Sequence, residues 1–199
     1  MKRAFDAALA SLGLLMSAPL WLVCAALIRL EDGGAVFYTQ ERVGRRGCRF
    51  RALKFRSMRP DAELDSGPLQ ARHADERVTH VGRVMRATAL DELPQLWNIL
   101  RGDMSFVGPR ALRPGEIERE GDAVVPLEAV PGYDARTAVR PGLTGIAQVY
   151  APRDISRRYK FKYDALYVRQ QSFWLDMRLI LLSFWISFRG TWESRGRKY

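Results

Sequence analysis

The stretch AALASLGLLMSAPLWLVCAALI (residues 7–28) is the longest uncharged segment of this 199-residue chain. Lys2 and Arg3 precede it, and Arg29 follows it directly. About 20 apolar residues are enough for a helix to cross the hydrocarbon core of a bilayer. The stretch therefore predicts a membrane-associated helix at the start of a protein whose length fits one domain.

Three interpretations of this segment are open. A cleaved signal peptide fits the basic start, but the apolar run is long and no clear cleavage site follows it. A simple span fits the length, although basic residues flank both ends and the positive-inside rule then favours both ends in the cytoplasm. A helix-break-helix fits both flanks, because Pro19 removes a backbone donor at the centre and the Ser17 hydroxyl can satisfy a freed carbonyl. In that case residues 1–32 form a re-entrant helix broken at Ser17–Pro19, and residues 33–199 form a separate domain on one side of the membrane.

The rest of the chain predicts an α+β fold that is mainly helical. Residues 35–40 and 48–55 flank a turn and predict a small β-hairpin. Residues 60–77 are polar and predict a loop, and residues 113–128 predict an exposed acidic helix. Further helices are expected at residues 81–100, with breaks near Gly82 and Pro94, and at residues 156–170 and 173–188. The last helix is rich in Phe and Trp and is either a core helix or an amphipathic interfacial helix.

The formal net charge of +10 favours anionic partners such as nucleic acid, lipid headgroups or phosphorylated substrates. The arginines are spread through turns and short motifs, which favours phosphate pockets over a nucleic-acid-binding tail. Cys24 and Cys48 are the only cysteines, and no Cys/His cluster indicates zinc. The chain also lacks the glycine-rich motifs of nucleoside triphosphatases and dinucleotide-binding folds.

The densest group of chemically active residues is LDELPQL (residues 90–96), which carries Asp91 and Glu92. Neighbours on a helix point about 100° apart, so the two carboxylates converge only if Pro94 distorts the turn. Alone, the pair is better explained as the acidic start of a helix, where negative charge is favourable. As a catalytic pair, one carboxylate would attack or bind a metal and the other would manage protons or metal.

Basic residues on several segments favour phosphate chemistry at this pair. Lys54 and Arg56 end the second strand, where alternation places them on the same face. Arg86 precedes the pair, whereas Arg110 and Arg140 each lie beside a Gly–Pro or Pro–Gly turn. Arginine forks bind phosphate oxygens at two points, and lysine supplies a point charge. Carboxylates and cations together suit phosphoryl transfer, with Mg²⁺ as the natural metal at Asp91 and Glu92.

The chain carries a series of ordered motifs: QERVG (40–44), KFRSM (54–58), LDELPQLWN (90–98), GDMSFVGPR (102–110), RPGLTG (140–145), and Tyr163-Asp164 through Trp174-Leu175-Asp176. In these motifs the chain resembles the bacterial sugar transferases, also called monotopic polyprenyl-phosphate phosphoglycosyl transferases. The resemblance covers nearly the whole chain and implies a re-entrant membrane helix with a cytoplasm-facing catalytic domain. The chain departs from the family pattern at Ala18, where the family usually has Ser beside the proline, and at Ala111, where many members have Pro.

The resemblance also implies a two-step reaction that uses magnesium. Asp91 would attack the phosphate of a UDP-sugar, release UMP and hold the sugar phosphate until polyprenyl phosphate, usually undecaprenyl phosphate, accepts it. Glu92 would assist with metal or protons, and Lys54, Arg86 and Arg110 match phosphate-binding positions. The expected partners are UDP-sugar, undecaprenyl phosphate and inner-membrane lipids at the cytoplasmic face of the bacterial inner membrane. A homodimer is a candidate assembly, and no nucleic acid is expected.

Two other classes of function are weighed against this one. A basic membrane-surface or nucleic-acid-binding module rests on net charge alone, and it would show salt-dependent binding without turnover. A noncatalytic membrane scaffold would tolerate the loss of both Asp91 and Glu92. The ordered motifs favour the transferase over both.

Overall fold

The computed structural model describes residues 1–60, 62, 75–120, 123–152 and 155–192. Its fold is mainly helical with small sheets, as the sequence predicts. The helices are α1 (Lys2–Asp32), α2 (His80–Thr88), α3 (Gln95–Arg101), α4 (Tyr133–Thr137), α5 (Ile146–Tyr150), α6 (Arg157–Gln170) and α7 (Phe173–Arg189), with short 3-10 turns η1 (Arg45–Gly47), η2 (Leu90–Glu92) and η3 (Leu127–Ala129). The strands are β1 (Phe37–Val43), β2 (Arg49–Phe55), β3 (Ser105–Val107), β4 (Ile117–Glu120), β5 (Ala123–Pro126) and β6 (Gly142–Thr144).

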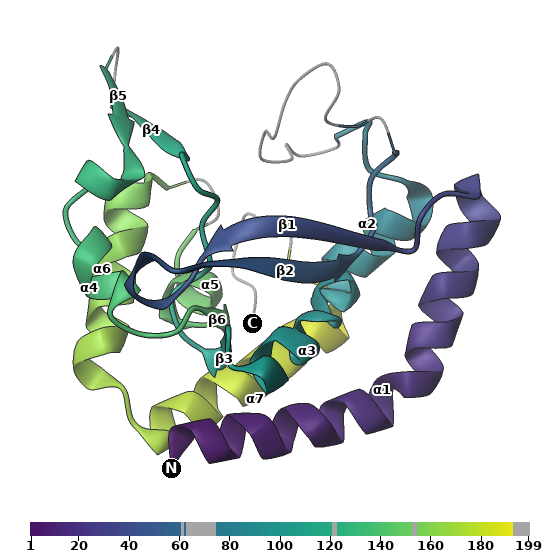
Figure 1. The fold of residues 1–199 in the computed structure, drawn as a ribbon, viewed down its shortest axis with the longest axis horizontal. Helices are drawn as coiled ribbons and strands as arrows, with labels where there is room; N and C mark the ends of the chain where they lie inside the picture. The colour runs from purple at the N-terminus through teal and green to yellow at the C-terminus, as the bar shows by residue number, and fades with distance from the viewer. Residues whose placement is uncertain (61, 63–74, 121–122, 153–154, 193–199) are drawn as a thin grey trace.

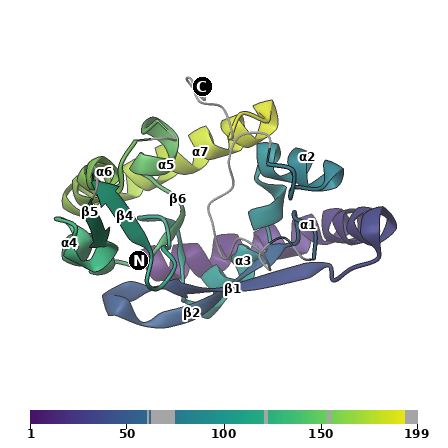
Figure 2. The ribbon, with the colours of Figure 1, turned by 90° about the horizontal axis from the view of Figure 1, so that it is seen from above.

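The strands of the described residues form three separate two-stranded sheets, β1–β2, β3–β6 and β4–β5. The predicted hairpin is confirmed as β1–β2, whose antiparallel register pairs Tyr38 with Lys54 and Arg42 with Phe50. Figures 1 and 2 show α3 lying between this hairpin and α7. The parallel pair β3–β6 brings the segment after α3 against the segment after α4.

Helix α1 is long and apolar enough to cross a membrane, with a mean hydropathy of 2.0 over an 18-residue window. Only 11% of that window is buried in the protein, whereas a core helix of a soluble protein is mostly buried. Figure 1 shows α1 bending sharply about halfway along its length. Pro19 lies inside the helix, and it accounts for the bend because it removes a backbone donor and crowds the preceding turn.

The helix is continuous through this bend, so the structure has a kink where the sequence predicts a break. The Ser17 hydroxyl is engaged there: it lies 3.5 Å from the Leu14 carbonyl oxygen and accepts a hydrogen bond from Trp21 Nε1 at 3.1 Å. Ser17 therefore ties the two turns on either side of Pro19 together.

Both ends of α1 are fastened to the rest of the fold by charged residues. At the start, Asp6 is buried and accepts hydrogen bonds from Ser105 Oγ at 2.9 Å and from the Phe106 backbone at 3.2 Å. At the end, Glu31 accepts from the His80 backbone N–H at 2.6 Å. Since α2 begins at His80, this carboxylate lies at the N-terminus of α2, where negative charge is favourable. Helix α1 is thus attached to the elements that surround residues 80–106.

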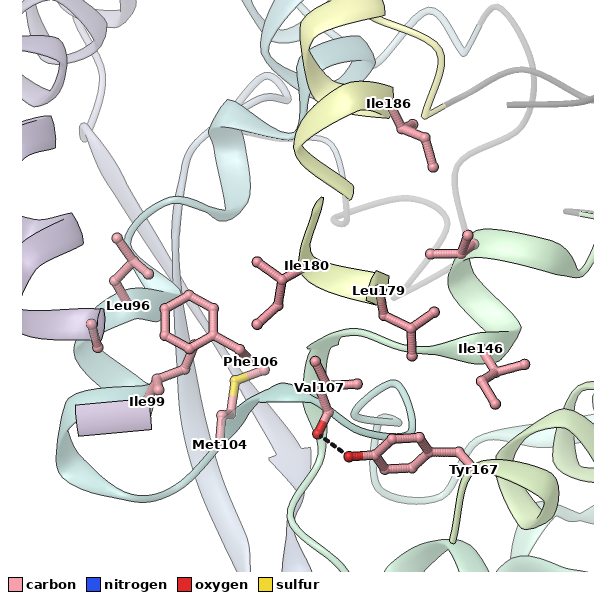
Figure 3. Packing of buried hydrophobic residues seen from close by; sticks show 12 residues of the cluster. Leu96, Ile99, Met104, Phe106, Val107, Ile146, Tyr167, Leu179, Ile180 and Ile186 are labelled. Atoms are coloured by element: carbon pink, nitrogen blue, oxygen red, sulfur yellow. Dashed lines mark hydrogen bonds between the residues drawn. The ribbon is translucent and has the colours of Figure 1, made fainter. Parts of the chain in front are cut away.

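The main core lies where α1, α3, α6 and α7 meet the β3–β6 pair (Figure 3). Ile99, Leu179 and Ile186 are fully buried in it. Tyr167 is 1% exposed, and its hydroxyl donates to the Val107 carbonyl oxygen at 3.0 Å. A second cluster joins Phe55 on β2 to the end of α1 and to α2.

The predicted helix over residues 113–128 is wrong, because this segment forms the β4–β5 hairpin followed by η3. The predicted break near Gly82 is also wrong, since Gly82 lies inside α2. A Cβ at Gly82 would lie 2.1 Å from the Ser57 carbonyl oxygen, so this glycine allows close packing of two segments. The break near Pro94 is confirmed between η2 and α3. The predicted loop at residues 60–77 falls largely outside the described residues.

Helix α7 has one buried and one exposed face. Leu179, Ile180 and Ile186 are buried, and Asp176 at 5% exposure accepts from the Tyr167 hydroxyl at 2.9 Å. The exposed face carries a set of large apolar side chains: Phe173, Trp174, Leu181, Phe184, Trp185 and Phe188. The buried face agrees with a core helix, and the interfacial role of the exposed apolar face stays a prediction.

Candidate active site

The turn between α2 and α3 determines where Asp91 and Glu92 point. Helix α2 ends at Ala89, whose φ of 59° is in the left-handed region, and η2 follows it. In a 3-10 turn, residues three apart lie on the same side. Leu90 and Leu93 pack into the hydrophobic core, so the remaining side of the turn, with both carboxylates, faces away from the core.

The two carboxylates converge on one lysine, which is the condition for Asp91 and Glu92 to act as a pair. Lys54 Nζ lies 2.5 Å from Glu92 Oε1 and 4.0 Å from Asp91 Oδ2. Arg110 Nη2 donates to the same Glu92 oxygen at 2.8 Å. Glu92 is therefore neutralised by two cations, whereas Asp91 has no cation nearer than Lys54 among the described ion pairs.

This arrangement separates the acidities of the two groups. Burial raises the pKa of Asp91 to about 6, against the opposing charge of Lys54 and with the aid of the charge of Glu92. Burial also acts on Glu92, but Arg110 and Lys54 outweigh it and hold the pKa of Glu92 well below its usual range. Near neutral pH both groups are ionised, with Asp91 the more basic carboxylate and the better candidate nucleophile.

The acidic pair lines a cavity of about 450 Å³, a size typical of sites for small molecules. The alternating residues Tyr38, Gln40 and Arg42 line one wall from β1. Lys54 joins the same face because it pairs with Tyr38 across the hairpin. The 2-residue period of a strand therefore directs one face of this hairpin into the cavity.

The structure brings four of the five predicted substrate-binding cations to this cavity. Lys54, Arg56, Arg86 and Arg110 all line it, and the charges of Arg86 and Arg110 act on the pKa of Asp91. Arg140 is not among the lining residues, and its Nε donates to the Gly102 carbonyl oxygen at 2.8 Å.

Arg56 lines the cavity but is held at the end of α1. Its Nη1 donates to Asp32 Oδ2 at 2.9 Å and its Nε to the Ala35 carbonyl oxygen at 2.6 Å. The sequence predicts the same substrate-binding role for Lys54 and Arg56, but in the structure the two cations have different partners.

The cavity contains further charged residues beyond those predicted from the sequence. Arg136 is 5% exposed, and its Nε donates to Asp164 Oδ2 at 2.9 Å while its Nη2 donates to the Arg110 carbonyl oxygen at 2.5 Å. Arg42 and Arg113 line the same cavity. Arg42 and Asp164 lie within motifs of the resemblance, which was the available signal, whereas Arg136 and Arg113 lie outside them.

The pair Asp91 and Glu92 suits a magnesium ion better than a metal held by protein alone. Within the described residues, no three His, Cys, Asp or Glu side chains gather as a metal site. Magnesium is usually bound by one or two carboxylates together with substrate phosphates and water. Two adjacent carboxylates in a cavity lined by cations fit that requirement.

These features are typical of an enzyme that acts on an anionic substrate beside a membrane. The family model described as "Bacterial sugar transferase" matches residues 1–190, and the chain belongs to this family of transferases. Its long exposed apolar helix and its family together suggest membrane association.

Relatives from several bacteria show the same similarity. The chain is 39% identical to the exopolysaccharide production protein ExoY of Rhizobium meliloti, over 90% of this chain and 81% of that protein. It is 40% identical to a UDP-glucose:undecaprenyl-phosphate glucose-1-phosphate transferase of Caulobacter vibrioides, over 90% and 67%. It is 42% identical to an undecaprenyl-phosphate glucose phosphotransferase of Komagataeibacter xylinus, over 92% of this chain but 35% of that longer protein.

Proposed function

We propose that this protein transfers a sugar 1-phosphate from a UDP-sugar to polyprenyl phosphate, with undecaprenyl phosphate as the acceptor, and releases UMP. This would be the first membrane step of bacterial polysaccharide or glycoconjugate synthesis. The observation that carries the proposal is the buried Asp91, held beside Lys54 and a neutralised Glu92 in a cavity lined by cations. The names of the Caulobacter and Komagataeibacter relatives support the choice of acceptor.

The reaction would proceed in two displacements at one phosphorus atom. An Asp91 oxygen attacks the sugar-linked phosphorus, the bond from this phosphorus to the UMP oxygen breaks, and UMP leaves with the electron pair. An oxygen of polyprenyl phosphate then attacks the same phosphorus, and the Asp91 carboxylate is released. Lys54 and Arg110 lie where they can stabilise charge on the phosphoryl oxygens, and Glu92 fixes both cations.

We further propose that Asp91 and Glu92 share a magnesium ion with the phosphates of the substrate. The bound ion would neutralise charge on the diphosphate and lower the cost of bringing it to two carboxylates. Lys54 and Arg110 occupy one oxygen of Glu92, so Asp91 and the second Glu92 oxygen are the available protein ligands in this proposal.

For the membrane, we propose that residues 1–32 form a re-entrant helix kinked at Ser17–Pro19. Residues 33–199 would then form a catalytic domain on the cytoplasmic face of the inner membrane. The bend in α1 and the exposed apolar faces of α1 and α7 support this arrangement. Reporter domains fused before residue 1 and after residue 32 should both be cytoplasmic, and a periplasmic reporter at either end would contradict the re-entrant helix.

The proposed reaction is tested by a UMP-release assay with undecaprenyl phosphate and a panel of UDP-sugars. Asp91→Asn should abolish release, because an amide is a poor nucleophile and cannot form the acyl phosphate. The matched control is Asp134→Asn, an exposed carboxylate on α4 that does not line the cavity. Intact mass after incubation with UDP-sugar alone should show a phosphosugar adduct on the wild-type protein. Near-normal turnover of Asp91→Asn would overturn the assignment of the nucleophile.

A further inference from the structure

A second group of arginines lines the cavity beside the acidic pair. Arg42 enters from β1, and Arg110 and Arg113 enter from the segment that follows β3. Arg42 and Arg110 lie within motifs of the resemblance, whereas Arg113 lies outside them. Like charges repel each other. Gathering three guanidinium groups therefore costs free energy, which a bound anion would offset.

The backbone holds these arginines together. Val43 N donates to the Leu112 carbonyl oxygen at 2.8 Å, which joins the end of β1 to the segment of Arg110 and Arg113. Arg42 Nη1 donates to the Ala111 carbonyl oxygen at 3.1 Å, and its Nη2 donates to Gln40 Oε1. The approach of the side chains is therefore built into the fold.

Around Arg42, Arg110 and Arg113, the cations that line the cavity outnumber the carboxylates. Glu92 is already shared by Lys54 and Arg110, and Glu116 bonds the Arg113 backbone and the Arg157 side chain. Burial and the charges of Arg110 and Arg113 lower the pKa of Arg42 to about 10. An anion bound here would relieve this repulsion.

Arg110 and Glu92 connect this group of arginines to Asp91. The charges that act on Arg42 come from Arg110, Arg113, Glu92 and Glu116, whereas those that act on Asp91 come from Lys54, Glu92, Arg86 and Arg110. Arg110 and Glu92 belong to both groups, and the bond between them links the arginines to the acidic pair.

The geometry of phosphoryl transfer indicates what a group of arginines next to the acidic pair can bind. The attacking and leaving oxygens lie roughly in line on opposite sides of the phosphorus. In the first displacement Asp91 attacks and UMP leaves on the far side. In the second displacement Asp91 is the leaving group, so the attacking lipid phosphate must enter from the side that UMP has vacated.

We propose that Arg42 and Arg113, together with Arg110, form one anion subsite that serves both displacements. It holds the phosphate of UMP as this leaves and then the phosphate of polyprenyl phosphate as this attacks. The inference rests on the proposed function and adds to it the residues that bind the two exchanging phosphates.

The test compares UMP with uridine as inhibitors of covalent loading by UDP-sugar, and measures KM for undecaprenyl phosphate. The variants are Arg42→Gln and Arg113→Gln, and the control is Arg51→Gln, an exposed arginine of the same hairpin outside the cavity. Wild type and control should bind UMP at least tenfold more tightly than uridine, because charged hydrogen bonds to phosphate are worth about tenfold or more in affinity. Both variants should lose most of this preference and show a KM for the lipid phosphate raised by about tenfold.

The outcomes separate this inference from the proposed function. A wild-type protein that releases no UMP contradicts the proposed function itself. Release with an unchanged preference for UMP over uridine in both variants overturns the subsite. Loss of that preference with an unchanged KM for the lipid phosphate overturns its sharing by the two substrates. Should Arg42→Gln fail to fold because its bond to Ala111 is lost, Arg42→Lys keeps the charge and should keep part of the preference, and Arg113→Gln decides.

Discussion

Lys54 and Arg56 are two residues apart, yet they serve different parts of the molecule. Lys54 lies in β2 and contacts both carboxylates of the cavity. Arg56 lies just beyond the end of β2 and binds Asp32 at the end of α1. The alternation of a strand stops where the strand stops, so two cations with the same sequence signal acquire a chemical role and an anchoring role.

The largest expected effect comes from exchanging each cation for methionine. Lys54→Met should lower turnover by about 100-fold or more, because it removes a preorganised charge next to the reacting phosphate. Arg56→Met should instead lower the free energy of unfolding by about 2 kcal/mol, since Asp32 and the Ala35 carbonyl lose their partner. Turnover per folded molecule and urea unfolding in detergent measure the two effects. Equal losses of turnover in both variants would contradict the division of roles.

The pH dependence of covalent loading should sharpen the same comparison. Asp91 must be ionised to attack, and burial raises its pKa to about 6, so loading should fall as the pH drops through about 6. Glu92 stays ionised across this range because Arg110 and Lys54 lower its pKa despite its burial, so the fall should reflect one proton. The charge of Lys54 lowers the pKa of Asp91, so Lys54→Gln should move the fall to higher pH while Arg56→Gln leaves it in place. A profile that Lys54→Gln does not move would contradict the electrostatic role of Lys54.

The smallest expected effect concerns Glu31, the neighbour of Asp32. Glu31→Gln keeps a hydrogen-bond acceptor for the backbone of His80 but removes the negative charge at the N-terminus of α2. The expected loss of stability is about 0.5 to 1 kcal/mol. Thermal unfolding in detergent measures it, with Glu41→Gln on the exposed side of the hairpin as the control. A loss as large as that of Arg56→Met would mean that both acids at the end of α1 anchor the helix equally.

Much of the fold could be predicted from local patterns. The hairpin β1–β2 follows from period-2 alternation around a glycine turn, and α6 and α7 follow from helical spacing between residues 156 and 189. The hairpin β4–β5 was missed because its glutamates favour a helix. In the structure Glu116 and Glu118 instead bind the start of α6, through the side chain and the backbone of Arg157, and such contacts between distant segments leave no local pattern.

The sequence by itself determined the apolar helix with its central proline, the mainly helical fold and the acidic pair after α2. These depend on composition and on spacing within a few residues. Only the tertiary structure decided which cations meet the pair. Lys54, which precedes Glu92 in the chain, and Arg110, which follows it, both contact Glu92. Arg56 instead binds Asp32, and Arg140 binds the Gly102 carbonyl oxygen at the end of α3. Charge interactions depend on distance in space, and for residues this far apart in the chain that distance is set by the packing of α1, the hairpin and the β3–β6 pair.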